Sequence, residues 1–138
     1  MTEPPFPSTE RTMDAAIGFQ HLGGEDGQAR GRFEISDNVR QPYGIVHGGA
    51  YAAAAESLAS AATYVAVVGD GMLAMGQSNH TSFLRPVSEG TIHAVGTARH
   101  RGRTSWVWEV EFTDDEGRLC ALSRVTMAVR PAPSAEGA

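Results

Sequence analysis

The chain has 138 residues and a mass of 14.6 kDa, which suits one domain and leaves no room for two full cores. Its 41% hydrophobic and 20% charged residues are typical of a globular protein, and its net charge of −5 argues against a nucleic-acid binder. The single cysteine, Cys120, excludes an intrachain disulfide and a cysteine-based zinc site, so we expect a cytoplasmic location. No uninterrupted apolar run reaches the ~18 residues of a membrane span, and the N-terminus lacks the pattern of a signal peptide, so no membrane segment is expected.

The two ends of the chain differ in composition from its middle. Residues 1–11 and 132–138 are rich in proline and in small or polar side chains, which is typical of flexible tails. No repeat or internal linker interrupts the stretch between them. We therefore expect a disordered N-terminal tail, one folded domain over residues 12–131, and a flexible C-terminal tail.

The first elements after the N-terminal tail are short. Thr12 is suited to cap a short helix that has Asp14 in its first turn. Over residues 28–35, small or apolar side chains alternate with charged ones, and this period of two predicts a strand with one solvent-facing side. Residues 37–43 are polar and contain a proline, so they predict a loop.

Residues 48–68 are the one long helix candidate, because they are rich in alanine and other good helix formers. Gly69 follows in the position of a C-terminal cap. The segment is small or apolar on nearly every side. This pattern predicts a helix that is buried over most of its surface.

The second half of the chain contains four strand candidates joined by short turns. Residues 114–117 predict a hairpin turn, in which Gly117 can adopt a positive φ. Short turns between successive strands predict an antiparallel sheet, and one long helix against one curved antiparallel sheet is an α+β architecture. The strands are expected over residues 73–84, 91–100, 104–113 and 118–129.

Glu56 is the only Asp, Glu, Lys or Arg between Arg40 and Asp70. A lone carboxylate in an apolar helix is costly unless it is solvated, paired or protonated. It either acts as an acid, base or nucleophile, or faces a subunit interface or a solvent gap. Ser60 lies four residues later on the same helix face, where its hydroxyl would hold a water beside the carboxylate or simply allow close packing.

Gly48 and Gly49 fall at the start of this helix, where N–H groups lack intrahelical partners and the helix dipole favours negative charge. These glycines either bind a developing oxyanion or only let the chain turn into the helix. Glu56 lies eight residues beyond Gly48, which is about 12 Å along a regular helix and too far for both to contact one carbonyl group. We therefore infer a site shared by two subunits across a two-fold interface.

Other polar clusters carry weaker signals. Residues 100–104 (HRGRT) form a basic group in an acidic protein, which is either a solvated turn or a phosphate clamp. The five histidines do not show the spacing of metal ligands, so no metal site is expected.

Residues 41–49 (QPYGIVHGG), followed by Glu56 nine residues after His47, resemble the hotdog-fold acyl-CoA thioesterases. Within that family the chain is most similar to the Arthrobacter-type 4-hydroxybenzoyl-CoA thioesterase. The likeness continues through residues 76–83 (GQSNHTSF), 115–121 and 128–131, and so covers nearly the whole folded part. It implies a hotdog fold, in which a curved antiparallel β-sheet wraps around one long central α-helix.

The resemblance also implies hydrolysis of an aromatic acyl-CoA, similar to 4-hydroxybenzoyl-CoA, to the free acid and CoA. Glu56 would attack the thioester or activate water, and the Gly48 N–H would polarise the thioester carbonyl. Asp14 would border the acyl pocket. The other implied catalytic residues are Gln41, His47 and Ser60, and those implied to hold CoA are Arg85, Arg103 and Thr104; the relative has threonine at position 60 and serine at position 103.

The family further implies a homotetramer, a dimer of hotdog dimers, with no metal or redox cofactor, since CoA is part of the substrate. Other interpretations remain open. The acyl group could be 1,4-dihydroxy-2-naphthoyl, phenylacetyl or a medium-chain acyl group. A non-catalytic acyl-CoA binder is the alternative of a different class, although binding CoA does not by itself require a lone carboxylate on an apolar helix.

Overall fold

The structure of the protein is a computed structural model that describes residues 9–133. Residues 1–8 and 134–138, which make up most of the two predicted tails, lie outside the described residues. The last three residues of the predicted N-terminal tail form a 3-10 helix, η1 (Thr9–Arg11).

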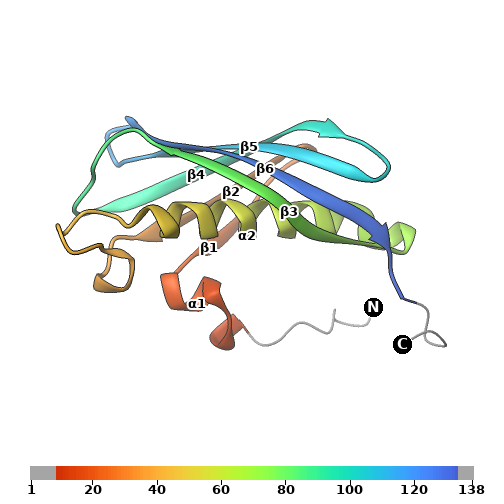
Figure 1. Ribbon diagram of the computed structural model, residues 1–138, viewed down its shortest axis with the longest axis horizontal. Coiled ribbons are helices and arrows are strands. Elements are labelled where there is room, and N and C mark those ends of the chain that lie inside the picture. The colour runs from red at the N-terminus through yellow and green to blue at the C-terminus, as the bar shows by residue number, and fades with distance from the viewer. Residues whose placement is uncertain (1–8, 134–138) are drawn as a thin grey trace.

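An antiparallel sheet of six strands curves over one long helix, α2 (Gly48–Val67), while the short α1 (Met13–Ile17) lies on the far side of α2 from the sheet (Figure 1). The strand order β1-β2-β4-β5-β6-β3 leaves β3 at one edge, with β6 on its inner side and no described strand on its outer side. The predicted α+β architecture is therefore confirmed. The strands are β1 (Gln20–Gly23), β2 (Gln28–Glu34), β3 (Met72–Phe83), β4 (Thr91–Arg101), β5 (Ser105–Thr113) and β6 (Leu119–Pro131).

The five longer strands follow their predicted ranges to within one or two residues, but β1 was not predicted. It has only four residues, and all four are exposed, so it lacks the alternation of buried and exposed side chains that reveals a strand. Thr12 caps α1 as expected, because its side chain accepts a hydrogen bond from the Ala15 N–H. Gly117 has the expected positive φ of 79°.

Helix α2 begins at a capped N-terminus and ends in a tighter turn. The Nδ1 atom of His47, the N-cap residue, accepts a hydrogen bond of 2.7 Å from the Gly49 N–H. The prediction that Gly69 caps the C-terminus is wrong. The chain continues through the 3-10 helix η3 (Val68–Asp70), and Gly71, with a φ of 75°, is the left-handed residue that ends the turn.

Helix α2 is only partly buried, and its exposed side chains lie on more than one side of the helix. The sheet covers Ala54, Ala55 and Leu58, and the alanines let the helix lie close to the strands. Glu56 is exposed and Val65 is 75% exposed. The expectation of burial over most of the surface is therefore wrong, because alanine-rich composition hides which side the sheet covers.

The segment Gly48–Asp70 has 23 residues and contains an 18-residue window with a mean hydropathy of 1.3, so by length and composition alone it is able to cross a membrane. The sequence-based expectation that no such segment exists considered only uninterrupted runs of apolar residues. The many alanines of this segment keep its mean hydropathy high although polar residues interrupt it. In the fold, this helix packs along the curved sheet and supplies core residues. Its place is that of the central helix of a globular domain.

A buried hydrogen bond fixes the C-terminal half of α2 to the sheet. The Trp108 Nε1–H donates to the Thr63 hydroxyl (2.8 Å), and this hydroxyl donates to the Ala59 carbonyl one turn earlier (2.7 Å). Both side chains are almost fully buried. The helix position relative to β5 is thus set by a polar contact inside an apolar core.

Candidate active site

Helix α2 runs alongside the edge strand β3 in the opposite direction. A Cβ atom on Gly48 would lie 2.6 Å from the Phe83 ring, and the Asn79 side chain hydrogen-bonds to the Ala52 carbonyl (2.9 Å). Further along, the Glu56 carboxylate lies against Gly76. Successive turns in the first half of α2 therefore contact successive positions along β3.

Glu56 and Ser60 line one cleft of about 660 Å³ beside this strand. Glu56 is exposed on the isolated protomer, which agrees with the solvated alternative that the sequence left open. Its surroundings combine two alanines with four polar side chains and two large apolar ones. The complete lining is Met13, Ala52, Ala53, Glu56, Ser57, Ser60, Asn79, Thr81 and Phe83.

The predicted oxyanion group lies at the N-terminus of α2. His47 accepts from the Gly49 N–H through its side chain and from the Ala50 N–H through its carbonyl. Among the described residues, no hydrogen-bond partner is found for the Gly48 N–H. Gln41 lies in the preceding loop, where its Oε1 accepts from the Tyr43 N–H.

Helix α2 is regular from Gly48 onward, so the separation between Gly48 and Glu56 along one helix stays at about 12 Å. One protomer therefore does not bring the Gly48 N–H and the Glu56 carboxylate to the same carbonyl group.

The residues predicted to hold CoA lie at opposite ends of the sheet. Arg85 follows β3, and its N–H donates to the Cys120 carbonyl (3.1 Å) near the start of β6. Arg103 and Thr104 are exposed in the turn between β4 and β5, which is next to Val129 near the end of β6. Seven residues of β6 separate the partner of Phe83 from the partner of Ser105, a span of about 23 Å. A single protomer does not gather these three residues.

Asp14, predicted to border the acyl pocket, pairs instead with His21; its Oδ2 lies 2.9 Å from the His21 Nε2. Its neighbour Met13 is 66% exposed and lines the Glu56 cleft. Helix α1 thus reaches the cleft through Met13.

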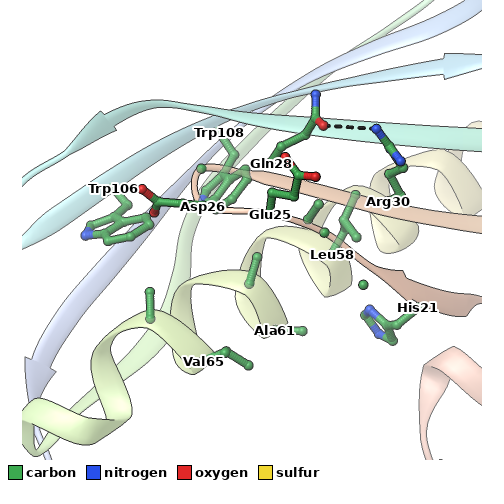
Figure 2. Close-up of a pocket in the computed structure, with 16 residues that line it drawn as sticks. His21, Glu25, Asp26, Gln28, Arg30, Leu58, Ala61, Val65, Trp106 and Trp108 are labelled. Atoms are coloured by element: carbon green, nitrogen blue, oxygen red, sulfur yellow. Dashed lines mark hydrogen bonds between the residues drawn. The ribbon is translucent and has the colours of Figure 1, made fainter.

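A second cavity, of about 510 Å³, lies on the other side of α2 (Figure 2). Its walls are largely apolar and include Ala61, Val65, Trp106 and Trp108, with the charged side chains of the β1–β2 turn at the rim. None of the predicted site residues lines it. It is therefore separate from the Glu56 cleft.

Two buried titratable groups lie outside both cavities. Burial raises the pKa of the Tyr51 hydroxyl, and the nearby Cys120 and Asp114 add to the effect. Burial also raises the pKa of the Cys120 thiol, reinforced by Asp114. Both groups stay protonated near neutral pH and are poor nucleophiles. No cluster of metal-ligating side chains occurs among residues 9–133.

Sequence reasoning missed Gly76, Asn79 and Thr81 as neighbours of Glu56. They belong to the run GQSNHTSF, which carried the family resemblance without assigned roles. The signal that was available is the period of two over residues 79, 81 and 83, which puts these side chains on the same side of β3.

Comparison with known proteins places this arrangement in a family. The model of the Thioesterase superfamily matches residues 43–121, which is more than half of the chain and includes α2 and β3. The chain belongs to this superfamily and is a thioester hydrolase with a hotdog fold.

The relatives are similar over most of their length. The chain is 37% identical to the proofreading thioesterase EntH of Cronobacter turicensis (86% of this chain, 85% of the relative). It is 34% identical to the 1,4-dihydroxy-2-naphthoyl-CoA hydrolase of Escherichia coli (82% and 81%). Among solved structures, a variant of a thioesterase from Pseudomonas aeruginosa has a TM-score of 0.86 at 31% identity, covering 90% of this chain and 89% of that chain.

These relatives confirm the hotdog thioesterase prediction. The narrower likeness to the Arthrobacter-type 4-hydroxybenzoyl-CoA thioesterase is not confirmed.

Proposed function

We propose that the protein hydrolyses an aromatic acyl-CoA, of the 4-hydroxybenzoyl-CoA type, to the free acid and CoA, with Glu56 as the reacting carboxylate. The observation that carries the proposal is the cleft in which Glu56 lies beside the Ser60 hydroxyl, on an exposed side of a helix that contains no other charged side chain. That the E. coli relative is named as the hydrolase of an aromatic acyl-CoA supports this substrate class.

Thioester hydrolysis needs a carboxylate, a hydroxyl that orients water and an N–H donor for the carbonyl oxygen. Water, or Glu56 itself, adds to the thioester carbonyl carbon, and the carbonyl oxygen gains negative charge that a helix N-terminal N–H stabilises. In the water route Glu56 takes the proton of the water, and Ser60 orients that water. The C–S bond then breaks, and the departing CoA thiolate takes back the proton held by Glu56 and leaves as the thiol. In the direct route, attack by Glu56 forms a mixed anhydride, which a water molecule hydrolyses to the free acid and the Glu56 carboxylate while the proton of that water goes to the CoA thiolate.

A second protomer supplies the missing oxyanion group. The edge of β3 is free to pair with the same strand of another copy. In an antiparallel pairing about a two-fold axis between Asn79 and His80, Gly76 of one strand lies opposite Phe83 of the other. Because Glu56 contacts Gly76 and Gly48 contacts Phe83, this register brings Glu56 level with Gly48 of the partner subunit.

The same register also joins the CoA-binding groups. It sets Arg85 opposite Ala74 of the partner subunit, and Ala74 pairs with Val129, whose N–H donates to the Thr104 carbonyl. Arg85 then lies about three strand spacings, or about 14 Å, from the partner's Arg103–Thr104 turn. That separation suits a ligand as extended as the CoA nucleotide, and two such dimers would form the expected homotetramer.

The experiment measures thiol release from 4-hydroxybenzoyl-, 1,4-dihydroxy-2-naphthoyl-, phenylacetyl- and octanoyl-CoA. We expect the aromatic esters to give the highest kcat/KM. Glu56→Gln should lower kcat by about 100-fold or more, because it removes the acid–base or nucleophilic group. The matched control Glu34→Gln changes an exposed carboxylate on β2, far from the cleft, and should keep wild-type activity.

Faster hydrolysis of octanoyl-CoA than of every aromatic ester would contradict the aromatic substrate. Wild-type rates in Glu56→Gln, or no hydrolysis of any ester by the wild type, would contradict the proposed function as a whole.

A further inference from the structure

The Glu56 carboxylate rests on a glycine of the neighbouring strand. A Cβ atom built on Gly76 would lie 2.8 Å from the Glu56 Cδ and 3.0 and 3.1 Å from the two carboxylate oxygens. The pairing of β3 with β6 shifts register between Gly76 and Ser78, at the same point of the strand. Any side chain at position 76 would therefore occupy the place that the carboxylate takes.

The helix turn that carries Glu56 is also tied to β3. The Asn79 Nδ2–H donates a hydrogen bond of 2.9 Å to the Ala52 carbonyl. Ala52 is four residues before Glu56, so in a regular helix its carbonyl also accepts the Glu56 N–H. The Asn79 amide thus holds the same peptide group that anchors Glu56 to the preceding turn.

A chain of hydroxyls orients the Asn79 amide. The Thr81 hydroxyl donates to Asn79 Oδ1 (2.8 Å), so the Ser123 hydroxyl, 2.8 Å from Thr81, donates to Thr81 in turn. Ser123 is fully buried on β6. Each group in this series therefore donates to the next: Ser123 to Thr81, Thr81 to Asn79, and Asn79 to Ala52. Because the Asn79 Oδ1 accepts from Thr81, its NH₂ group points to the helix. The cleft wall is anchored in the core of the sheet.

We propose that Gly76, Asn79 and Thr81 are positioning residues that set where the Glu56 carboxylate sits for the reaction. The proposal rests on the proposed function of Glu56 as the reacting carboxylate. Gly76 leaves the space in which the carboxylate lies, and Asn79, oriented by Thr81, fixes the helix turn behind it. A displacement of about 1 Å at a reacting group can cost about 100-fold in rate.

The first test is Gly76→Ala. Gly76 has no positive φ, so alanine fits the backbone, and the atoms it meets are the movable end of the Glu56 side chain. We therefore expect a melting temperature close to wild type, a nearly unchanged KM, and a kcat lower by about 10- to 100-fold. The matched control is Gly69→Ala, where a Cβ meets nothing within 4 Å, and it should match wild type in all three.

The second test compares Thr81→Val with Thr81→Ser. Valine keeps the shape and removes the hydroxyl, whereas serine keeps the hydroxyl. We expect Thr81→Val to lower kcat with little change in KM, and Thr81→Ser to retain most of the activity. The control for a lost buried hydroxyl is Thr63→Val, because Thr63 hydrogen-bonds α2 well away from Glu56; it should lower the melting temperature while kcat stays near wild type.

A readout without substrate separates this inference from the proposed function. Hydrogen exchange of the Glu56 N–H should be faster in Thr81→Val than in wild type, while Thr63→Val leaves it unchanged, whatever ester the enzyme takes. Wild-type kcat in both Gly76→Ala and Thr81→Val, or unchanged exchange at Glu56 in Thr81→Val, overturns the positioning roles. Loss of activity in Glu56→Gln alone would then still support the proposed function.

Discussion

At the scale of single residues, Arg85 would join the proposed CoA site only if a second subunit brought the Arg103–Thr104 turn near it. It is exposed at the end of β3, about one strand length from the Arg103–Thr104 turn of its own protomer. None of the described hydrogen bonds or ion pairs engages its guanidinium group, which leaves that group available for a phosphate.

We expect Arg85→Ala to raise KM for CoA esters several-fold and to change kcat little, because Arg85 would bind the CoA part of the substrate and not the reacting carbonyl. Arg30→Ala is the matched control. Arg30 is an exposed arginine on β2 that hydrogen-bonds Gln28, across the sheet from β3. Steady-state kinetics on both variants decides the question, and an unchanged KM in Arg85→Ala removes this residue from the CoA site.

At the scale of elements, the turn between β5 and β6 is held by one carboxylate. Asp114 accepts hydrogen bonds from the Glu116 N–H (2.9 Å), the Arg118 N–H (2.9 Å) and the Arg118 Nε–H (2.8 Å). Burial tends to raise the pKa of Asp114, but these hydrogen bonds and the Arg118 charge outweigh it and hold the pKa below its ordinary value of 3.8. The turn joins β5 to β6 next to Cys120.

A carboxyl group whose pKa is lowered by folding stabilises the native state above its ordinary pKa and loses that contribution as the pH falls toward its folded pKa. We therefore expect the free energy of unfolding to drop as the pH falls below about 4. Asp114→Asn should be less stable at pH 7 and show a smaller drop toward acid. Urea unfolding between pH 7 and 3 measures this.

The exposed carboxylate Asp70 provides the control for acid stability. Asp70→Asn should keep the acid slope of wild type, and an equal slope in Asp114→Asn would argue against a stabilising role for the Asp114 turn.

At the scale of the whole molecule, the proposed site needs groups from two copies of the chain. The Glu56 cleft is open, and the Gly48 N–H lies two helical turns away at the end of α2 that contacts Phe83. Large apolar side chains are exposed on and next to β3, including Met75 (53%), Phe83 (59%) and Leu84 (54%). An edge strand with such side chains is a surface that another copy would cover.

Mixing two inactive variants tests the shared site. Glu56→Gln disables one half of each site and Gln41→Ala the other. If both halves come from different subunits, refolding the two variants together restores about a quarter of the wild-type sites, because half of the dimers are mixed and each has one intact site. No recovery, although sedimentation shows mixed dimers, would mean that each chain carries a complete site.

Local patterns in the sequence determined most of the secondary structure and singled out Glu56. Periodicity, caps and turn residues act over a few neighbours, so the long strands, the Thr12 cap and the start of α2 could be predicted from them. The lone charge of Glu56 in an apolar helix is a feature of composition. It identified the residue but did not predict its exposure, because alanine is compatible with either side of a helix.

The tertiary structure alone decided which residues surround Glu56. Gly76 and Asn79 lie twenty or more residues from Glu56 in the sequence, and their contacts depend on how α2 is aligned with β3. No local pattern encodes that alignment, since it results from the packing of small side chains between helix and sheet. The four-residue β1 and the opposite placement of Arg85 and Arg103 likewise followed from strand pairing, which joins distant parts of the chain.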